Sequence, residues 1–490
     1  MSPSYDYIIV GSGAGGAAAA WRLAESGAEV LLLEKGEPLP RDGSTLDVEQ
    51  VIRKGRFKSD EVWLDKDGNR FAPEETFNLG GKTKWYGAAL LRFAPEEFEA
   101  DAGHQCLPSP LSYEQLAPYY AEAETRLGVR IFAPEPGLSA IVKRLVRGNS
   151  GWQSQPMPLA LAPEIIEHPE EARHFDAFAS VKGLKFEAER AFLDALKGRP
   201  NLRLLTGQAA AHLEGDPDNP RRIRAVETSG GQSFEGRTVL LAAGALHSPR
   251  LLQDYLRRSG LEADLPCAPM VGRNYKQHLL TAVVAFSPRR QRDLLRKTLV
   301  LLNDRLPHSS VQPLGFDAEL IGALMPALVP RPLATALGHY AYGFFLQTED
   351  GSSAENRVVA DRNGGPPRLD YDPKRLGPAL AEHRRLVRTL GLGLLRAGFT
   401  AFAKPIPLAG TAHACGSLVA GHDPAQSVVD AEGKVHGLDN LYVADGSVLA
   451  RSSRVNPSLT IYAWALRLAH RLIERRERVA HEPAHQSIDA

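Results

Sequence analysis

A cluster of glycines near the start of the chain has the residue types needed to bind phosphate groups. The segment reads Gly11-Ser12-Gly13-Ala14-Gly15-Gly16. In such a turn one glycine allows the tight bend, a second lets the backbone approach a pyrophosphate, and a third lets the next helix pack closely. The N–H groups that open a helix also carry partial positive charge toward the phosphates. The spacing therefore predicts a dinucleotide site.

The elements on both sides of this turn are those that such a site needs. Tyr5–Val10 is a short apolar run typical of a buried parallel strand, and residues 17–26 are mostly good helix formers. Val30–Leu33 predicts a second strand, followed by Glu34 and Lys35. An acid about 20 residues after the turn can accept hydrogen bonds from a ribose. We expect both residues to border the nucleotide, although this βαβ unit alone does not separate NAD from FAD.

A second glycine-rich segment covers residues 79–89 and reads Leu-Gly-Gly-Lys-Thr-Lys-Trp-Tyr-Gly-Ala-Ala. Two adjacent glycines, a threonine and two aromatic side chains could wrap a flat ring system, and a turn entering a helix is the simpler alternative. The candidate ligand contacts in this segment are Gly80, Gly81, Thr83, Trp85 and Gly87.

Small residues recur where later strands are expected to end. Ala210 follows a predicted strand and turn, and residues 238–245 predict a strand that ends at Ala243-Gly244. Small side chains allow backbone to approach a ligand closely. The strand predicted at residues 441–444 ends at Asp445-Gly446, whose N–H groups could face a phosphate.

These motifs together resemble the glucose-methanol-choline (GMC) oxidoreductase family of flavoproteins. The C-terminal part carries the most specific match, because His413-Ala-Cys-Gly-Ser417, residues 435–447 and residues 452–461 follow in the family's order. The segment around Gly80-Gly81 is nearest the sugar-oxidising members, similar to pyranose oxidase and to gluconate or fructose dehydrogenase. Trp85 stands one place earlier than in those members.

The resemblance implies the cofactor and a catalytic pair. It identifies the dinucleotide as FAD, and it places His413 and Asn456 against the flavin. A neutral histidine can accept the proton of an alcohol while hydride passes to flavin N5, and Asn456 can hold the alcohol oxygen. The helix that begins near Pro457 would stabilise the reduced flavin through its positive end.

Some members of the family attach FAD covalently through a histidine in the second glycine segment. This chain has Lys84, Trp85 and Tyr86 there, so we expect FAD to be non-covalent. The expected partners are a small alcohol or sugar substrate and an electron acceptor (oxygen, a quinone or a cytochrome), and the sequence leaves a partner subunit open.

The fold class that follows is α/β. We expect a Rossmann-like FAD-binding domain formed by residues 1–100, 190–278 and 405–490, and a substrate domain with a mostly antiparallel sheet and helices formed by residues 101–189 and 279–404. Within the latter, residues 339–349 are aromatic and nearly alternating, as in a strand with one wall of rings. Gln347 on this strand could contact a sugar hydroxyl, or it could be an ordinary strand residue with partners inside the protein.

Composition excludes several other classes of protein. The 58 basic and 58 acidic residues cancel, whereas a nucleic-acid footprint would need a basic excess. Three cysteines make no disulfide framework, and neither they nor the histidines have the spacing of a metal site, so no metal is expected. No apolar run reaches the length of about 18 residues that a transmembrane helix needs. With the first strand beginning near Tyr5, a cytoplasmic protein is expected.

The sequence therefore predicts an FAD-dependent enzyme that oxidises an alcohol on a sugar, glycoside or related polyol. Oxidation of an apolar or aromatic alcohol is an alternative, because the aromatic strand would suit it. A non-catalytic flavin-bearing subunit and a flavin monooxygenase are alternatives of other kinds. Neither needs the His413 and Asn456 pair.

Overall fold

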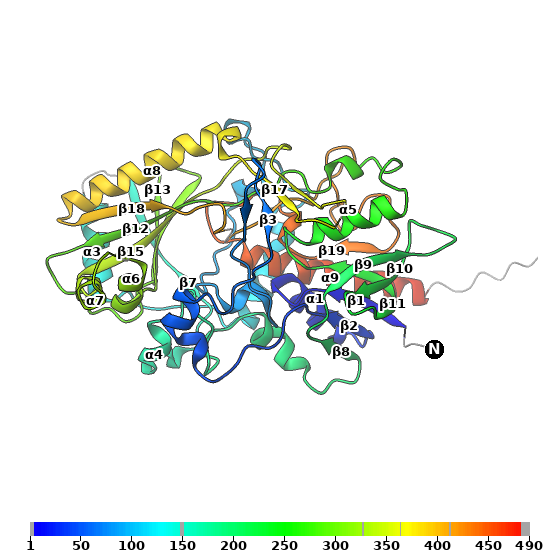
Figure 1. The fold of residues 1–490 in the computed structure, drawn as a ribbon, viewed down its shortest axis with the longest axis horizontal. Helices are drawn as coiled ribbons and strands as arrows, with labels where there is room; N and C mark the ends of the chain where they lie inside the picture. The colour runs from blue at the N-terminus through cyan, green and yellow to red at the C-terminus, as the bar shows by residue number, and fades with distance from the viewer. Residues whose placement is uncertain (1–3, 148–150, 326–327, 363, 411–412, 482–490) are drawn as a thin grey trace, which may run out of the picture.

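Two large β-sheets organise the chain, one mostly parallel and one antiparallel, and they lie on opposite sides of Figure 1. The computed structural model describes residues 4–147, 151–325, 328–362, 364–410 and 413–481. Helices cover both sheets. The two sheets correspond to the dinucleotide-binding and substrate parts that the sequence predicts, so the expected α/β fold class is confirmed.

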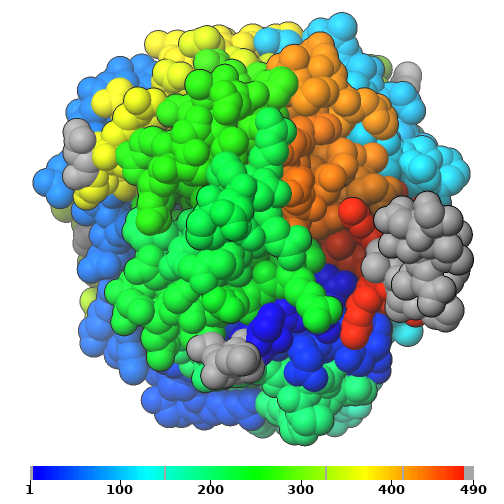
Figure 2. Space-filling view, turned by 90° about the vertical axis from the view of Figure 1, so that its right-hand side faces the viewer, coloured from blue at the N-terminus to red at the C-terminus, as the bar shows by residue number. Residues whose placement is uncertain are grey.

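The first sheet is built around short strands that are buried on both faces, as parallel strands usually are. Its parallel strands are, in order, β8 (Leu202–Leu205), β2 (Val30–Leu33), β1 (Tyr5–Val10), β11 (Ser233–Leu241) and β19 (Leu441–Val443), and the antiparallel strands β10 (Ile223–Thr228) and β9 (Ala210–Gly215) extend β11. Figure 2 shows the outer side of this region, where the green segment around β9–β11 lies beside the orange segment around β19.

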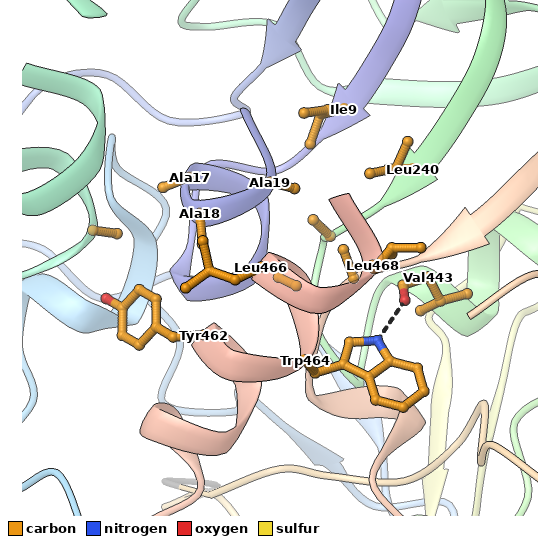
Figure 3. Close-up of a cluster of buried hydrophobic side chains, with 14 of the residues drawn as sticks. Ile9, Ala17, Ala18, Ala19, Leu240, Val443, Tyr462, Trp464, Leu466 and Leu468 are labelled. Carbon is orange, nitrogen blue, oxygen red and sulfur yellow. Dashed lines mark hydrogen bonds between the residues drawn. The ribbon is translucent and has the colours of Figure 1, made fainter. Parts of the chain in front are cut away.

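Two helices from opposite ends of the chain pack together beside this sheet. Helix α1 (Ala14–Glu25) is rich in alanine, and α9 (Ser458–His481) lies against it (Figure 3). Small side chains on α1 allow the two helices to approach closely. The Trp464 indole N–H donates to the carbonyl of Val443 over 3.0 Å, which ties α9 to strand β19.

The second sheet is antiparallel throughout. Its order is β18 (Thr400–Pro405), β12 (Leu279–Phe286), β15 (Ala341–Thr348), β14 (Ser309–Pro313), β13 (Leu299–Asn303) and β6 (Trp152–Pro156). Burial alternates along β12, because one face packs against α8 (Gly377–Arg396) through Leu386 and Leu390. The opposite face is turned toward the loop at residues 451–456.

Smaller elements connect the two sheets. They are the sheet β16 (Arg357–Val359), β17 (Arg368–Asp370), β3 (Trp63–Leu64) and β4 (Arg70–Phe71), the pair β5 (Arg130–Ile131) and β7 (Pro158–Leu159), and the helices α2 (Tyr113–Arg126), α3 (Pro136–Val146), α4 (Pro169–Ala172), α5 (Ser248–Arg258), α6 (Ala318–Leu324) and α7 (Arg331–Gly338). Strands β3 and β17 lie near the centre of Figure 1. Since this small sheet joins both predicted domains, their residue boundaries stay a prediction.

Among the helices of the described residues, none is both long and apolar enough to span a membrane.

Candidate active site

Three glycines of the first turn are fixed by packing. A Cβ on Gly11, whose φ is +103°, would lie 2.4 Å from the carbonyl oxygen of Ala242. A Cβ on Gly15 would lie 1.6 Å from the carbonyl oxygen of Ala444, and one on Gly16 would lie 1.8 Å from that of Gly11. The turn therefore sits against the ends of β11 and β19, where no side chain fits.

Gly13 differs from the other three, because it faces open space. No described heavy atom lies within 4 Å of the position of its Cβ, and no described side chain caps the N-terminus of α1 that begins at Ala14. The opening N–H groups of α1 are thus available to an anion. Gly244, at the end of β11, also has open space around it. This open, uncapped turn fits the pyrophosphate of a dinucleotide.

Ser12 joins the two glycine segments, and Glu34 holds Ser12 in place. The backbone N–H and the hydroxyl of Ser12 donate to Glu34, the first over 2.9 Å, and the N–H of Gly80 donates to the Ser12 hydroxyl over 2.9 Å. The N–H of Gly36 donates to the other oxygen of Glu34. Burial raises the pKa of Glu34, although these hydrogen bonds oppose the rise. Glu34 therefore organises the turn, and its contact with a ribose stays a prediction.

The second glycine segment lies directly against the first. A Cβ on Gly81 would lie 3.1 Å from Cα of Gly13. Gly80 and Gly81 both have left-handed φ values, +86° and +56°, and a short 3-10 helix, Gly81–Lys84, follows. Thr83 donates to the carbonyl of Gly80 over 2.6 Å, which closes this turn. Segments about seventy residues apart thus form one cradle, and its contact with the two halves of one ligand stays a prediction.

The remaining candidates of the second segment are engaged with protein. The Trp85 indole donates to Asn78 over 2.9 Å, and its ring packs on Phe57. Gly87 leaves room for the ion pair between Asp176 and Lys297, since a Cβ there would lie 2.2 Å from the carboxylate. Both residues shape the segment, and any contact that they make with a ring system stays a prediction.

Asp445 connects the ends of β11 and β19. One carboxylate oxygen accepts from the N–H of Gly244 over 2.8 Å, and the other accepts from the N–H of Ser447 over 2.9 Å. The N–H of Ala243 is bound by the Ser248 hydroxyl. The Asp445 side chain therefore links two turns. The predicted anion contact concerns the backbone of Asp445 and Gly446, and it stays a prediction.

Three further cofactor candidates lie at element ends. Ala210 opens β9, and Pro457 precedes α9 and accepts the first-turn bond from Ile461. Lys35 pairs with Glu61 over 3.1 Å and lies 3.6 Å above the ring of Phe77.

The structure brings together the predicted catalytic residues. Nδ2 of Asn456 lies 3.3 Å from Nε2 of His413, although 43 residues separate them. Oδ1 of Asn456 accepts from the side-chain amide of Gln312 on β14. This bond turns the Asn456 NH₂ group toward His413. The Asn456 amide therefore has a defined orientation relative to His413.

The His413 imidazole is neutral at neutral pH. Burial lowers its pKa well below the usual histidine value, and the nearby His278, Lys297 and Lys82 lower it further. A neutral imidazole with a free ring nitrogen can accept a proton.

The loop at residues 451–456 positions Asn456, and sequence reasoning missed what holds it. Ser453 has a left-handed φ of +68°. Its N–H donates to Glu349 over 3.0 Å, and its hydroxyl donates to Glu97 over 2.6 Å. Glu349 in turn pairs with Arg451. Burial raises the pKa of Glu349, but hydrogen bonds from Arg451 and His308 outweigh it and hold that pKa well below its usual range.

Gln347 lies at this loop as well. Its side-chain amide donates to the carbonyl of Arg454 over 2.8 Å, and the Ser310 hydroxyl donates to the same oxygen over 2.7 Å. Gln347 thus has a partner inside the protein, and a contact with a sugar hydroxyl stays a prediction.

Fold and site together define the class of protein: a dinucleotide-dependent oxidoreductase whose antiparallel sheet faces a histidine–asparagine pair. Two sequence models, both described as GMC oxidoreductase, match residues 5–280 and 397–465. The chain belongs to the GMC oxidoreductase family, and the family predicted from the sequence is confirmed.

Individual relatives agree with this membership. The chain is 30% identical to 6'''-hydroxyparomomycin C oxidase of Streptomyces lividus, over 97% of this chain and 93% of that one. It is 29% identical to paromamine 6'-oxidase of Streptomyces fradiae, over 95% and 90%. Among solved structures, pyridoxine 4-oxidase from Mesorbium loti matches with a TM-score of 0.66 and 20% identity, over 96% of this chain and 99% of that one, which concerns the fold alone.

Proposed function

We propose that the protein oxidises an alcohol group of a sugar, a glycoside or a related polyol to a carbonyl, with FAD as its cofactor. The observation that carries this proposal is the oriented pair of His413 and Asn456, 3.3 Å apart. Nε2 of His413 takes the hydroxyl proton, and the Asn456 amide donates to the alcohol oxygen and restricts its orientation. FAD, when bound, supplies the hydride acceptor at flavin N5.

The cradle formed by the two glycine segments supports FAD as the cofactor. The open backbone at Gly13 and the uncapped N-terminus of α1 would hold the pyrophosphate. Gly80 and Gly81 extend the cradle beyond the part that would hold the adenosine half of FAD. Lys84, which stands in the segment where some relatives carry a linking histidine, forms ion pairs with Glu187 and Glu189. This favours non-covalent FAD.

The substrate class is supported by relatives and by polar groups near the pair. The names of two relatives refer to oxidation of aminoglycosides or their fragments. Gln312 and Ser310 on β14 and Gln347 on β15 provide amides and a hydroxyl beside the loop that carries Asn456. Such groups match substrates with several hydroxyls.

An apolar or aromatic alcohol is the second candidate. Phe345 is the register partner of Gln312, and it belongs to a partly buried apolar cluster with Trp85 and Phe286. The same sheet face thus has an apolar part. We also propose that the protein is cytoplasmic and that it associates with a partner subunit. Its electron acceptor is oxygen, a quinone or a cytochrome.

A substrate screen tests the proposal. The holoenzyme is mixed anaerobically with paromamine, with neutral sugars and polyols, and with benzyl and aliphatic alcohols, and flavin absorbance is followed. We expect bleaching by at least one sugar or glycoside. Bleaching by apolar alcohols alone would replace the sugar hypothesis with the second candidate. Repeating the assay with oxygen and with an artificial quinone identifies the acceptor, and acid precipitation shows whether flavin is released.

Replacing the base gives the second test. His413→Ala should retain FAD and slow flavin reduction by about 10²–10⁴-fold, as expected for loss of a general base. His422→Ala is the matched control, because His422 is an exposed histidine near in sequence. Unchanged flavin reduction in His413→Ala would remove His413 from the mechanism.

A further inference from the structure

A second buried histidine, His278, lies behind His413. The two Nδ1 atoms are 2.9 Å apart, and the rings meet edge to face at 82°. Nε2 of His278 is 2.7 Å from the carbonyl oxygen of Ser453. His278 directly precedes strand β12, and 135 residues separate it from His413. It therefore connects the base to the loop that carries Asn456.

The hydrogens in this chain of contacts can be assigned by chemistry. A carbonyl oxygen only accepts, so Nε2 of His278 carries a hydrogen and donates to Ser453. Burial lowers the pKa of His278 to about 4, so the ring is neutral near pH 7 and its Nδ1 has a free lone pair. The hydrogen between the two rings must then belong to Nδ1 of His413. A neutral His413 with hydrogen on Nδ1 has a bare Nε2.

We propose that His278 is a positioning residue that fixes His413 in the tautomer whose bare Nε2 faces Asn456. The inference rests on the proposed role of His413 as the base. The Ser453 carbonyl orients His278 through one hydrogen bond, and His278 orients His413 through the next. In the other tautomer Nε2 of His413 would carry a hydrogen, and it could not accept the proton of an alcohol.

The Ser453 carbonyl is itself held in place, which gives the chain a fixed starting point. Two buried carboxylates bind this residue: Glu349 accepts from its N–H and Glu97 from its hydroxyl. They hold a non-glycine residue at a φ of +68°, a conformation that is sparsely populated. The fixed direction of the carbonyl follows from these contacts and not from the preferences of serine.

Asn456 favours the same tautomer of His413 through its contact with Nε2. Its Oδ1 is occupied by the Gln312 amide, so its NH₂ group points at Nε2 of His413. An N–H donor there matches a bare Nε2 and would oppose one that carries a hydrogen. Two independent sets of contacts, through His278 and through Gln312, thus select one tautomer.

The test uses holoenzyme and three variants. His278→Leu removes the acceptor for Nδ1 of His413, and we expect flavin reduction to slow by about 10²-fold or more, as for other bases held in the wrong tautomer. His278→Asn puts an amide oxygen near the place of Nδ1, and it should restore the rate to within about 10-fold of wild type. His383→Leu is the control, because His383 is a partly buried histidine that is bound to Thr281 and Thr348 rather than to His413.

A readout that needs no substrate separates this inference from the proposed function. In ¹⁵N-histidine-labelled wild-type holoenzyme, His413 should show a protonated Nδ1 and an unprotonated Nε2, and His278 should show the reverse. In His278→Leu the Nε2 signal of His413 should move toward the protonated range. A wild-type His413 with hydrogen on Nε2, or a His278→Leu variant no slower than His383→Leu, would overturn the proposal. Absence of any sugar oxidation with this tautomer present would instead contradict the proposed function alone.

Discussion

The turn at residues 11–16 and the loop at residues 451–456 both hold backbone close to the predicted cofactor, and they are stabilised by opposite means. In the turn, side chains are absent: a Cβ on Gly15 would collide with a carbonyl oxygen at 1.6 Å. In the loop, Ser453 carries a side chain and still adopts a left-handed φ, because two buried carboxylates bind this residue. The glycines of the turn depend on space, with Glu34 bound to Ser12 as an added support, and the loop depends on a buried ion pair.

This difference separates what each region contributes. Glycines that pack against the ends of β11 and β19 fix the turn by close backbone contact. The loop needs Glu349, which is fully buried, and its partner Arg451, which is 4% exposed. Removing two charges from water is costly, and such a pair is retained only when further hydrogen bonds satisfy it. The loop therefore places Asn456 at an energetic cost that the turn does not have.

The largest expected effect compares two glycines of the turn. Gly15→Ala should destabilise the fold by about 3 kcal/mol or more, because the new Cβ must displace backbone. Gly13→Ala should leave stability almost unchanged, since its Cβ meets open space, but should weaken FAD binding. Thermal unfolding of the apoproteins and flavin titration separate the two outcomes. If both variants lost stability equally, the turn would not depend on space in the way described.

The buried pair gives an effect of comparable size. Glu349→Gln leaves the Arg451 guanidinium buried without its charge partner, which typically costs about 3–5 kcal/mol. Because Glu349 also binds the N–H of Ser453, flavin reduction should slow as well. Glu235→Gln is the control: its ion pair with Arg224 is exposed and should contribute at most about 1 kcal/mol. Urea unfolding measures both, and equal losses would contradict the importance of the buried charge.

The contrast also explains which features could be predicted from the sequence. Strands Tyr5–Val10 and Val30–Leu33 and the glycine turn were predicted because their patterns are local: apolar runs and missing side chains. The roles of His413 and Asn456 came from a family motif. By comparison, the contacts of Ser453 join residues 104 and 356 positions apart, and no spacing rule connects them.

His278 and Gln312 were missed for the same reason. His278 directly precedes β12, and the role proposed for it depends on a contact with His413, 135 residues away. Gln312 lies on β14, a strand of the antiparallel sheet that has no distinctive local pattern, and its partner Asn456 is 144 residues away. Polar residues near the ends of strands would have been the only signal.

A smaller effect on catalysis is expected from Gln312→Leu. This change removes the donor that occupies Oδ1 of Asn456, so the amide can rotate and its NH₂ group no longer points steadily at His413. We expect flavin reduction to slow by about 10-fold, the cost of one oriented hydrogen bond. Ser310→Ala, which removes a neighbouring bond to the Arg454 carbonyl, is the comparison. A larger loss in Ser310→Ala would mean that loop position, and not the direction of the amide, limits the rate.

The smallest effect is a pH dependence of the loop's support. Burial lowers the pKa of His308, but its hydrogen bond to Glu349 outweighs this and raises the pKa above the usual value. A raised histidine pKa means that protonated His308 stabilises the folded state at low pH, and that this contribution is lost as pH rises through the folded-state pKa. His308→Gln should therefore cost about 1 kcal/mol more near pH 5.5 than near pH 9. Urea unfolding at the two pH values measures the difference. The buried carboxyl of the glycine turn, Glu34, is present in wild type and in Gly15→Ala alike, so the stability difference between these two proteins should change little between the two pH values. A pH-dependent difference there would show that the turn also depends on a titrating group.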